Sequence, residues 1–138
     1  MKRNGILKIS GIVILLAITI HTGCSGKIQR ESGYLKGVIS IGPICPVETI
    51  PPEPGCLPTA ETYKAYPVSI FTADGKMRIT QLSPSLNGHF NSELFPGNYL
   101  IKLERDQTNI GRSNLPVEVT ITSGDTTLLD ISIDTGIR

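Results

Sequence analysis

From residue 34 onward, short apolar stretches alternate with polar positions, and turn residues interrupt the pattern about every ten positions. The alternation is clearest in residues 99–104, where Tyr99, Ile101 and Leu103 share one face and the intervening residues share the other. A period of two is typical of a half-buried β-strand, and no part of residues 34–138 shows a convincing helical period of 3.6. The pattern therefore predicts an all-β domain.

The apolar stretches predict seven strands, which are expected to pack as an antiparallel sandwich of the prealbumin or immunoglobulin-like type. Tight turns are expected at Asp74-Gly75 and at Pro96-Gly97-Asn98. About 20 inward-facing side chains supply a core that is adequate for a small sandwich. The strands are expected at about residues 34–41, 66–72, 77–82, 89–95, 99–104, 116–122 and 128–134.

The first 23 residues differ from the rest and are predicted to be a lipoprotein signal peptide, residues 1–23. A positively charged head precedes a nine-residue apolar run at 12–20, which is too short to span a membrane. The ending Thr22-Gly23-Cys24 resembles a bacterial lipobox, in which signal peptidase II cuts before a cysteine that then receives lipid. Ordinary cleavage nearby, which would leave Cys24 as a free thiol, is the alternative.

Lipidation of Cys24 would attach the mature chain to the cell membrane or the outer membrane, on the extracytoplasmic side. Residues 24–33 are polar and lack periodicity, so they are expected to form a flexible tether to a domain at 34–138. The signal peptide holds three of the 13 Lys and Arg and none of the 12 Asp and Glu, so its removal changes the net charge from +1 to −2. This balance gives no electrostatic case for nucleic acid as a partner.

A proline-rich insert at residues 42–62 separates the first two predicted strands. Six prolines between residues 42 and 58 argue against a regular strand or helix there. An exported chain meets oxidising conditions, and once Cys24 is assigned to lipid, Cys45 and Cys56 are predicted to form a disulfide. In the chain-entropy model this ring stabilises the domain by about 3 kcal/mol. The insert then either covers one end of the sandwich or acts as a rigid recognition loop.

Six motifs follow one another along the chain: Gly37-Val38, Gly42-Pro43-Ile44-Cys45-Pro46-Val47, Cys56, Asn87-Gly88-His89-Phe90, Leu94-Phe95-Pro96-Gly97-Asn98-Tyr99 and Asp134-Thr135-Gly136-Ile137-Arg138. Together they resemble small bacterial lipoproteins of the carboxypeptidase regulatory-like (transthyretin-like) β-sandwich group. The resemblance covers residues 34–138, nearly the whole mature chain. It implies a β-sandwich with an accessory role and no catalysis, because the group is named for a domain that accompanies peptidases and lacks their metal ligands.

The residue pattern predicts no catalytic site, no metal site and no cofactor. His89 is the only histidine after residue 23 and lies on a predicted strand, away from the cysteines. Asp130 and Asp134 are four residues apart on an outward strand face, about 13 Å, which is too far for a glycosidase pair. Calcium binding at loop carboxylates is an open alternative to turn chemistry, with the candidates Asp74, Asp106 and Asp125.

The predicted function is a lipid-anchored, non-enzymatic module with a protein-interaction or structural role in the cell envelope. Glycan binding is the main alternative, because two tyrosines near the insert could stack on sugar rings. Protease inhibition is a more distant one, because residues 48–52 inside the ring resemble the reactive loop of Bowman–Birk inhibitors. The partner, an envelope protein or a glycan, is not identified by the sequence. The candidate contact residues are Glu48, Thr49, Ile50, Tyr63 and Tyr66.

Overall fold

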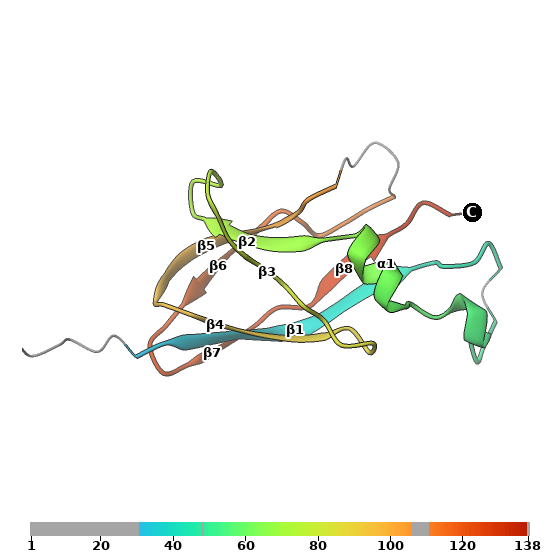
Figure 1. Ribbon diagram of the computed structural model, residues 1–138, viewed down its shortest axis with the longest axis horizontal. Helices are drawn as coiled ribbons and strands as arrows, with labels where there is room; N and C mark the ends of the chain where they lie inside the picture. Colours follow the sequence, from blue (N-terminus) through green and yellow to red (C-terminus); the bar gives the residue numbers. More distant parts are fainter. Residues whose placement is uncertain (1–30, 48, 106–110, 138) are drawn as a thin grey trace, which may run out of the picture.

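The computed structural model describes residues 31–47, 49–105 and 111–137, which fold as a two-layered β-sandwich (Figure 1). The predicted signal peptide, the lipidation site Cys24 and most of the tether lie outside these residues, as do Glu48 and Asp106. Within the described part of the chain, no helix is long and apolar enough to cross a membrane. The prediction of a β-sandwich is confirmed.

The strands form two four-stranded sheets. In the first sheet the central strand is β1 (Gly33–Gly42), which pairs on one side with β4 (His89–Leu94) and on the other with β7 (Thr126–Leu128) and β8 (Ile131–Asp134). The second sheet has the strand order β3 (Arg78–Gln81), β2 (Val68–Thr72), β5 (Gly97–Leu103) and β6 (Val117–Ile121).

The core lies between the two sheets, and it includes Ile101 and Leu103, which the alternation places on the inward face of β5. Ile70 and Ile101 stand opposite each other on β2 and β5, and both side chains are completely buried. Met77, just before the edge strand β3, and Ile79, on β3, are both exposed. The buried apolar residues are Leu35, Ile39, Ile41, Val68, Ile70, Leu82, Phe90, Leu94, Ile101, Leu103, Leu115, Ile121, Ile131 and Ile133.

The end of the chain differs from the prediction of one continuous antiparallel strand. It forms two short strands, β7 and β8, which both run parallel to β1. Between them the carbonyl of Leu129 turns toward Gly37, where a Cβ atom would lie only 1.8 Å from its oxygen. The carboxylate of Asp130 accepts instead from the N–H of Val38 (3.1 Å), so the two strands stay attached to β1 across the break. The described residues therefore contain eight strands where seven were predicted.

A short α-helix that the sequence pattern does not predict begins at the end of the insert and continues beyond it. Helix α1 (Ala60–Ala65) begins after Thr59, whose hydroxyl accepts from the N–H of Thr62 (3.3 Å), while the Thr62 hydroxyl accepts from the N–H of Thr59 (3.0 Å). This cap lacks the usual Glu or Gln, and six residues are too few to show a helical period. A single 3₁₀ turn, η1 (Pro54–Cys56), also forms among the prolines, because Pro54 at its start needs no N–H donor.

Candidate functional site

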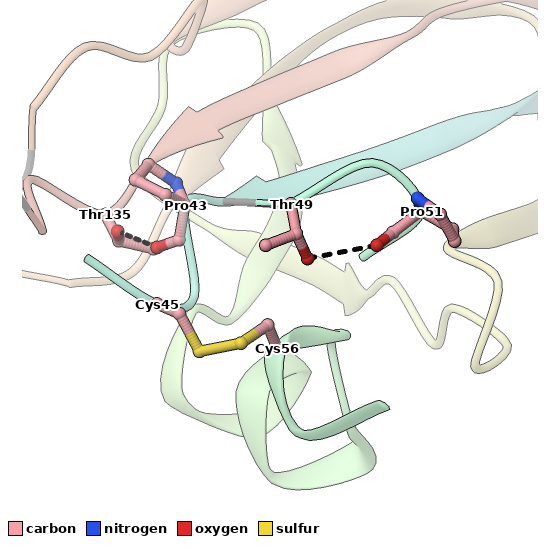
Figure 2. The surroundings of a disulfide bond; sticks show 6 residues. All are labelled: Pro43, Cys45, Thr49, Pro51, Cys56 and Thr135. Carbon is pink, nitrogen blue, oxygen red and sulfur yellow. Dashed lines mark hydrogen bonds between the residues drawn. A yellow bond between two sulfur atoms is a disulfide. The ribbon is translucent and has the colours of Figure 1, made fainter. Parts of the chain in front are cut away.

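A disulfide closes the insert into a loop at one end of the sandwich. Cys45 and Cys56 are bonded, with their Cα atoms 5.4 Å apart, as the sequence predicts (Figure 2). The start of this disulfide loop is fastened to the chain after β8 by Thr135, which is nearly buried. Thr135 donates from its N–H to the Gly42 carbonyl (3.0 Å) and from its hydroxyl to the Pro43 carbonyl. The loop is therefore held at its base by a covalent bond and by two hydrogen bonds.

Two adjacent hollows lie beside the disulfide loop and the end of β1, and together they are called the end groove. The larger, of about 720 Å³, is lined by residues 38–41 of β1 and by a wall of Leu57, Pro58, Thr59 and Tyr63. The second, of about 460 Å³, lies within the disulfide loop. Volumes of this size are typical of ligand-binding clefts. The residues that line both hollows are Ile41, Leu57 and Pro58.

Large apolar side chains are exposed around the end groove. Ile50 is fully exposed, Leu86 is 67% exposed and Leu57 is 48% exposed, and all three line the groove. The hydroxyl of Thr49 donates to the Pro51 carbonyl (3.0 Å), which holds the backbone beside Ile50 (Figure 2). Single exposed apolar residues are common, but several around one hollow are typical of a binding surface. Ile50, Leu57 and Leu86 are called the rim residues.

The two candidate tyrosines occupy different places. Tyr63, on α1, lines the end groove, and its hydroxyl donates to the carbonyl of Leu86 (3.5 Å). Burial raises the pKa of Tyr63 above its ordinary value of 10.0. Tyr66 follows α1 and is absent from the lining of the groove, and the guanidinium of Arg105 lies over its ring, 4.4 Å from the ring centre. The end groove therefore includes Tyr63 and not Tyr66.

Several acidic residues singled out by the sequence serve turns in the fold. Asp74 accepts from the hydroxyl of Thr72 and from the N–H of Lys76 (3.1 Å), and these bonds hold the pKa of Asp74 below its ordinary value. Asp134 accepts from the N–H of Gly136 (2.9 Å) just after β8. Among the residues that the structure describes, no group of three or more His, Cys, Asp or Glu is placed to hold a metal ion.

The sequence locates part of the end groove and misses the rest. Thr49, Ile50 and Tyr63 are predicted ligand contacts, and the structure brings all three to the groove. That they bind a ligand stays a prediction. Leu57 and Leu86 are absent from the predicted contacts, although each is a lone apolar residue beside proline or other turn-forming residues. A single apolar residue among turn-forming residues is the feature of the sequence from which both contacts could have been predicted.

Replacing both Cys45 and Cys56 with serine is expected to lower the free energy of unfolding by about 2–3 kcal/mol. The bond joins residues separated by 11 positions, and opening it gives the unfolded chain more conformations to occupy. The eight strands are expected to remain, because the disulfide loop lies outside the two sheets. Urea denaturation followed by circular dichroism measures the change.

The wild-type chain in a reducing agent is the matched control for this double variant, since it loses the same bond without any substitution. Both samples should unfold at the same urea concentration. A double variant as stable as the oxidised wild type would show that the loop bond contributes nothing to the fold.

Comparisons with known proteins show the fold alone. No protein-family model matches the chain, and no curated protein matches it. Among solved structures, the minor pilin GBS52 of Streptococcus agalactiae aligns 45% of its length with 76% of this chain, at 16% identity and a TM-score of 0.52. This likeness supports an immunoglobulin-like β-sandwich.

Two further solved structures match less closely. The major pilin subunit BcpA of Bacillus cereus aligns 29% of its length with 75% of this chain, at 14% identity and a TM-score of 0.48. A DUF3823 family protein from Parabacteroides merdae aligns 47% of its length with 76% of this chain, at 15% identity and a TM-score of 0.46. The chain thus spans less than half of the length of each of these three proteins.

Proposed function

We propose that this chain is a non-enzymatic β-sandwich of the cell envelope that is anchored by lipid at Cys24 and binds another protein through the end groove. The finer family assignment, to lipoproteins of the carboxypeptidase regulatory-like group, is part of the proposal and rests on the motifs of the sequence. The observation that carries the binding role is the set of exposed rim residues around a groove whose wall is held by a disulfide.

The rim residues can supply binding energy because they are exposed in the free chain. Burying one Leu or Ile side chain completely contributes about 1.5–3 kcal/mol. Ile50, which is fully exposed, has the most apolar surface to lose to a partner. The disulfide and the prolines restrict the loop before binding, so less conformational entropy is lost when a partner docks.

The direction of β1 is consistent with an end groove that points away from the membrane to which the chain would be anchored. The strand begins at Gly33, next to the predicted tether, and ends at Gly42, where the disulfide loop begins. Its ten residues span about 33 Å. Figure 1 shows the start of β1 and the insert at opposite ends of the sandwich. An anchor at Cys24 would therefore leave the end groove on the far side of the domain from the lipid.

Replacing two rim residues, Ile50→Ser and Leu86→Ser, is expected to weaken capture of an envelope protein by the anchored chain at least about tenfold. Each substitution removes an apolar contact worth a factor of ten or more when it is fully buried. Quantitative cross-linking in intact cells, followed by purification of the chain, measures the capture.

Leu128→Ser is the matched control, because Leu128 is 78% exposed on β7 and is not among the residues that line the groove. Its capture should equal that of the wild type. Equal capture by the rim variant and the wild type would remove the basis of the proposal. Saturable glycan binding that is lost in Tyr63→Ala would replace it with the carbohydrate-binding alternative.

A further inference from the structure

The central strand β1 is paired on both sides over its first part and on one side only over its last part. β4 pairs with residues 33–38, and a final hydrogen bond runs from the N–H of Ile39 to the carbonyl of Gly88 (2.9 Å). On the other side, β8 continues along β1 as far as Gly42. The last residues of β1 therefore present an open strand edge, and residues 38–41 also line the end groove.

The backbone of Ile41 points to this open edge. Even-numbered residues of β1 bond toward β7 and β8, as Lys36 and Gly42 do through their carbonyls. Alternation along a strand then directs the N–H and C=O of Ile41 to the opposite side. Among the described residues, no turn or loop bonds to either group, and the pairing of β4 with β1 stops before it reaches them. An N–H and a C=O at a sheet edge that no strand pairs can bond to an added strand.

Gly88 lies where the pairing of β4 with β1 stops. Its φ of +79° turns the chain away from β1, and its N–H bonds to the carbonyl of Ser85 (2.9 Å) instead of continuing the β1–β4 ladder. A Cβ atom at this position would lie 2.3 Å from the Ile39 carbonyl oxygen and 3.1 Å from the Tyr63 hydroxyl. The chain therefore packs closely against β1 at Ile39, and among the described strands none pairs with this edge of β1 beyond that residue.

We infer that the end groove binds an extended, uncharged segment of a partner protein as an added β-strand beside residues 39–42 of β1. This inference rests on the proposed function and names the form that the partner takes. The N–H and C=O of Ile41 would pair with the backbone of the segment, and the apolar wall would contact alternate side chains.

Charge selects this occupant. Among the residues that the structure describes, no Asp, Glu, Lys or Arg lines either hollow of the groove, so a charged segment would lose its hydration without compensation from them. The wall of Leu57, Pro58, Thr59 and Tyr63 lines the same hollow as residues 38–41 of β1. The predicted tether carries Lys27 and Arg30, which do not match an uncharged groove.

Random octapeptides displayed on phage, selected against the full anchored chain in detergent micelles, provide the probe. The enriched peptides should be uncharged, rich in β-forming residues and free of proline at their centre. Hydrogen exchange of the Ile41 amide should slow at least about tenfold in the presence of a selected peptide, because that amide gains a partner. N-methylation of the peptide amides that face β1 should weaken binding by about tenfold or more.

Leu57→Lys should weaken peptide binding by about tenfold, because it places a charge in the wall of the groove. Leu128→Lys, on β7, is the matched control and should bind the peptide as the wild type does. The inference would be overturned if no peptide is enriched, if the enriched peptides are rich in proline, or if exchange of the Ile41 amide does not slow when a selected peptide is added. If the Ile41 amide is protected from exchange without any peptide, and this protection rises with protein concentration, a second copy of the chain occupies the edge. If a synthetic peptide of residues 24–33 competes with the selected peptides for binding, the tether occupies it.

The proposed function and this inference fail in different ways. If cross-linking in cells depends on Ile50 and Leu86 but the Ile41 amide is not protected by any selected peptide, the partner binds the rim residues without adding a strand. If cross-linking is independent of the rim residues, the proposed function itself is wrong.

Discussion

Gly37→Ala is expected to lower the free energy of unfolding by more than about 3 kcal/mol, which for a domain of this size lowers the melting temperature by more than about 10 °C. A Cβ atom on residue 37 would lie 1.8 Å from the oxygen and 2.6 Å from the carbon of the Leu129 carbonyl, and 3.2 Å from the ring of Phe90. The carbonyl belongs to the backbone break between β7 and β8, and β1 is paired with β4 at Gly37 and with β7 and β8 just before and after it. Neither segment can move away without breaking strand pairing.

Thermal and urea denaturation followed by circular dichroism measure this loss. Gly55→Ala is the matched control, because a Cβ atom on residue 55 would meet nothing within 4 Å. Its stability should stay within about 0.5 kcal/mol of the wild type, as expected for an exposed position away from special features. A Gly37→Ala variant as stable as Gly55→Ala would mean that the chain does not break over residue 37.

Cys24→Ser is expected to abolish fatty-acid attachment, with a loss of label of at least about tenfold. The predicted modification needs a sulfur at this position, and serine has none. Two or more acyl chains bind a membrane stably because each buried CH₂ contributes about 0.8 kcal/mol. The measurement is the label on the purified full chain after growth of a bacterial host on an alkyne-tagged fatty acid, and the variant should also leave the membrane fraction once its signal peptide is cleaved.

The double variant Cys45→Ser and Cys56→Ser is the matched control for the lipid experiment. Its label should equal that of the wild type, because both sulfurs belong to the disulfide and not to the anchor. An unlabelled wild-type chain with one titratable thiol would contradict lipidation, and a mass that lacks the signal peptide would then establish ordinary cleavage near Cys24. Membrane retention alone does not decide the matter, since an uncleaved signal peptide also retains the chain.

Side-chain alternation predicts the strands well because it reports which face is buried. Ile101 and Leu103 on β5 are buried as expected, and Ile121 on β6 is too. The same pattern does not predict the break after β7, because Leu129, Ile131 and Ile133 continue to alternate with polar residues through it. Both short strands keep one register with β1, so the pattern contains no interruption. Alternation also does not predict parallel pairing, because it is the same whether the neighbouring strand is parallel or antiparallel.

The disulfide and half of the end groove could be predicted because they depend on residues close together in the sequence. Ile50 belongs to the proline-rich insert, and Tyr63 follows it. The open edge at Ile41 could not be predicted, because it depends on where β4 begins relative to the end of β1. That relation joins residues about 50 positions apart and depends on the turn at Gly88. The alternation of side chains within one strand does not show where its pairing with a distant strand ends.

The course of β1 also determines how the domain would respond to tension. A pull between a membrane anchor and a bound partner would enter β1 at Gly33 and leave it near Gly42, along the length of the strand. The ladders with β4, β7 and β8 would then be loaded in shear, with many hydrogen bonds strained together instead of opening one after another. The bonds of Thr135 to Gly42 and Pro43 tie the exit point to the last strand as well. Under such a load between an anchor and a partner, the sandwich would behave as a stiff coupling.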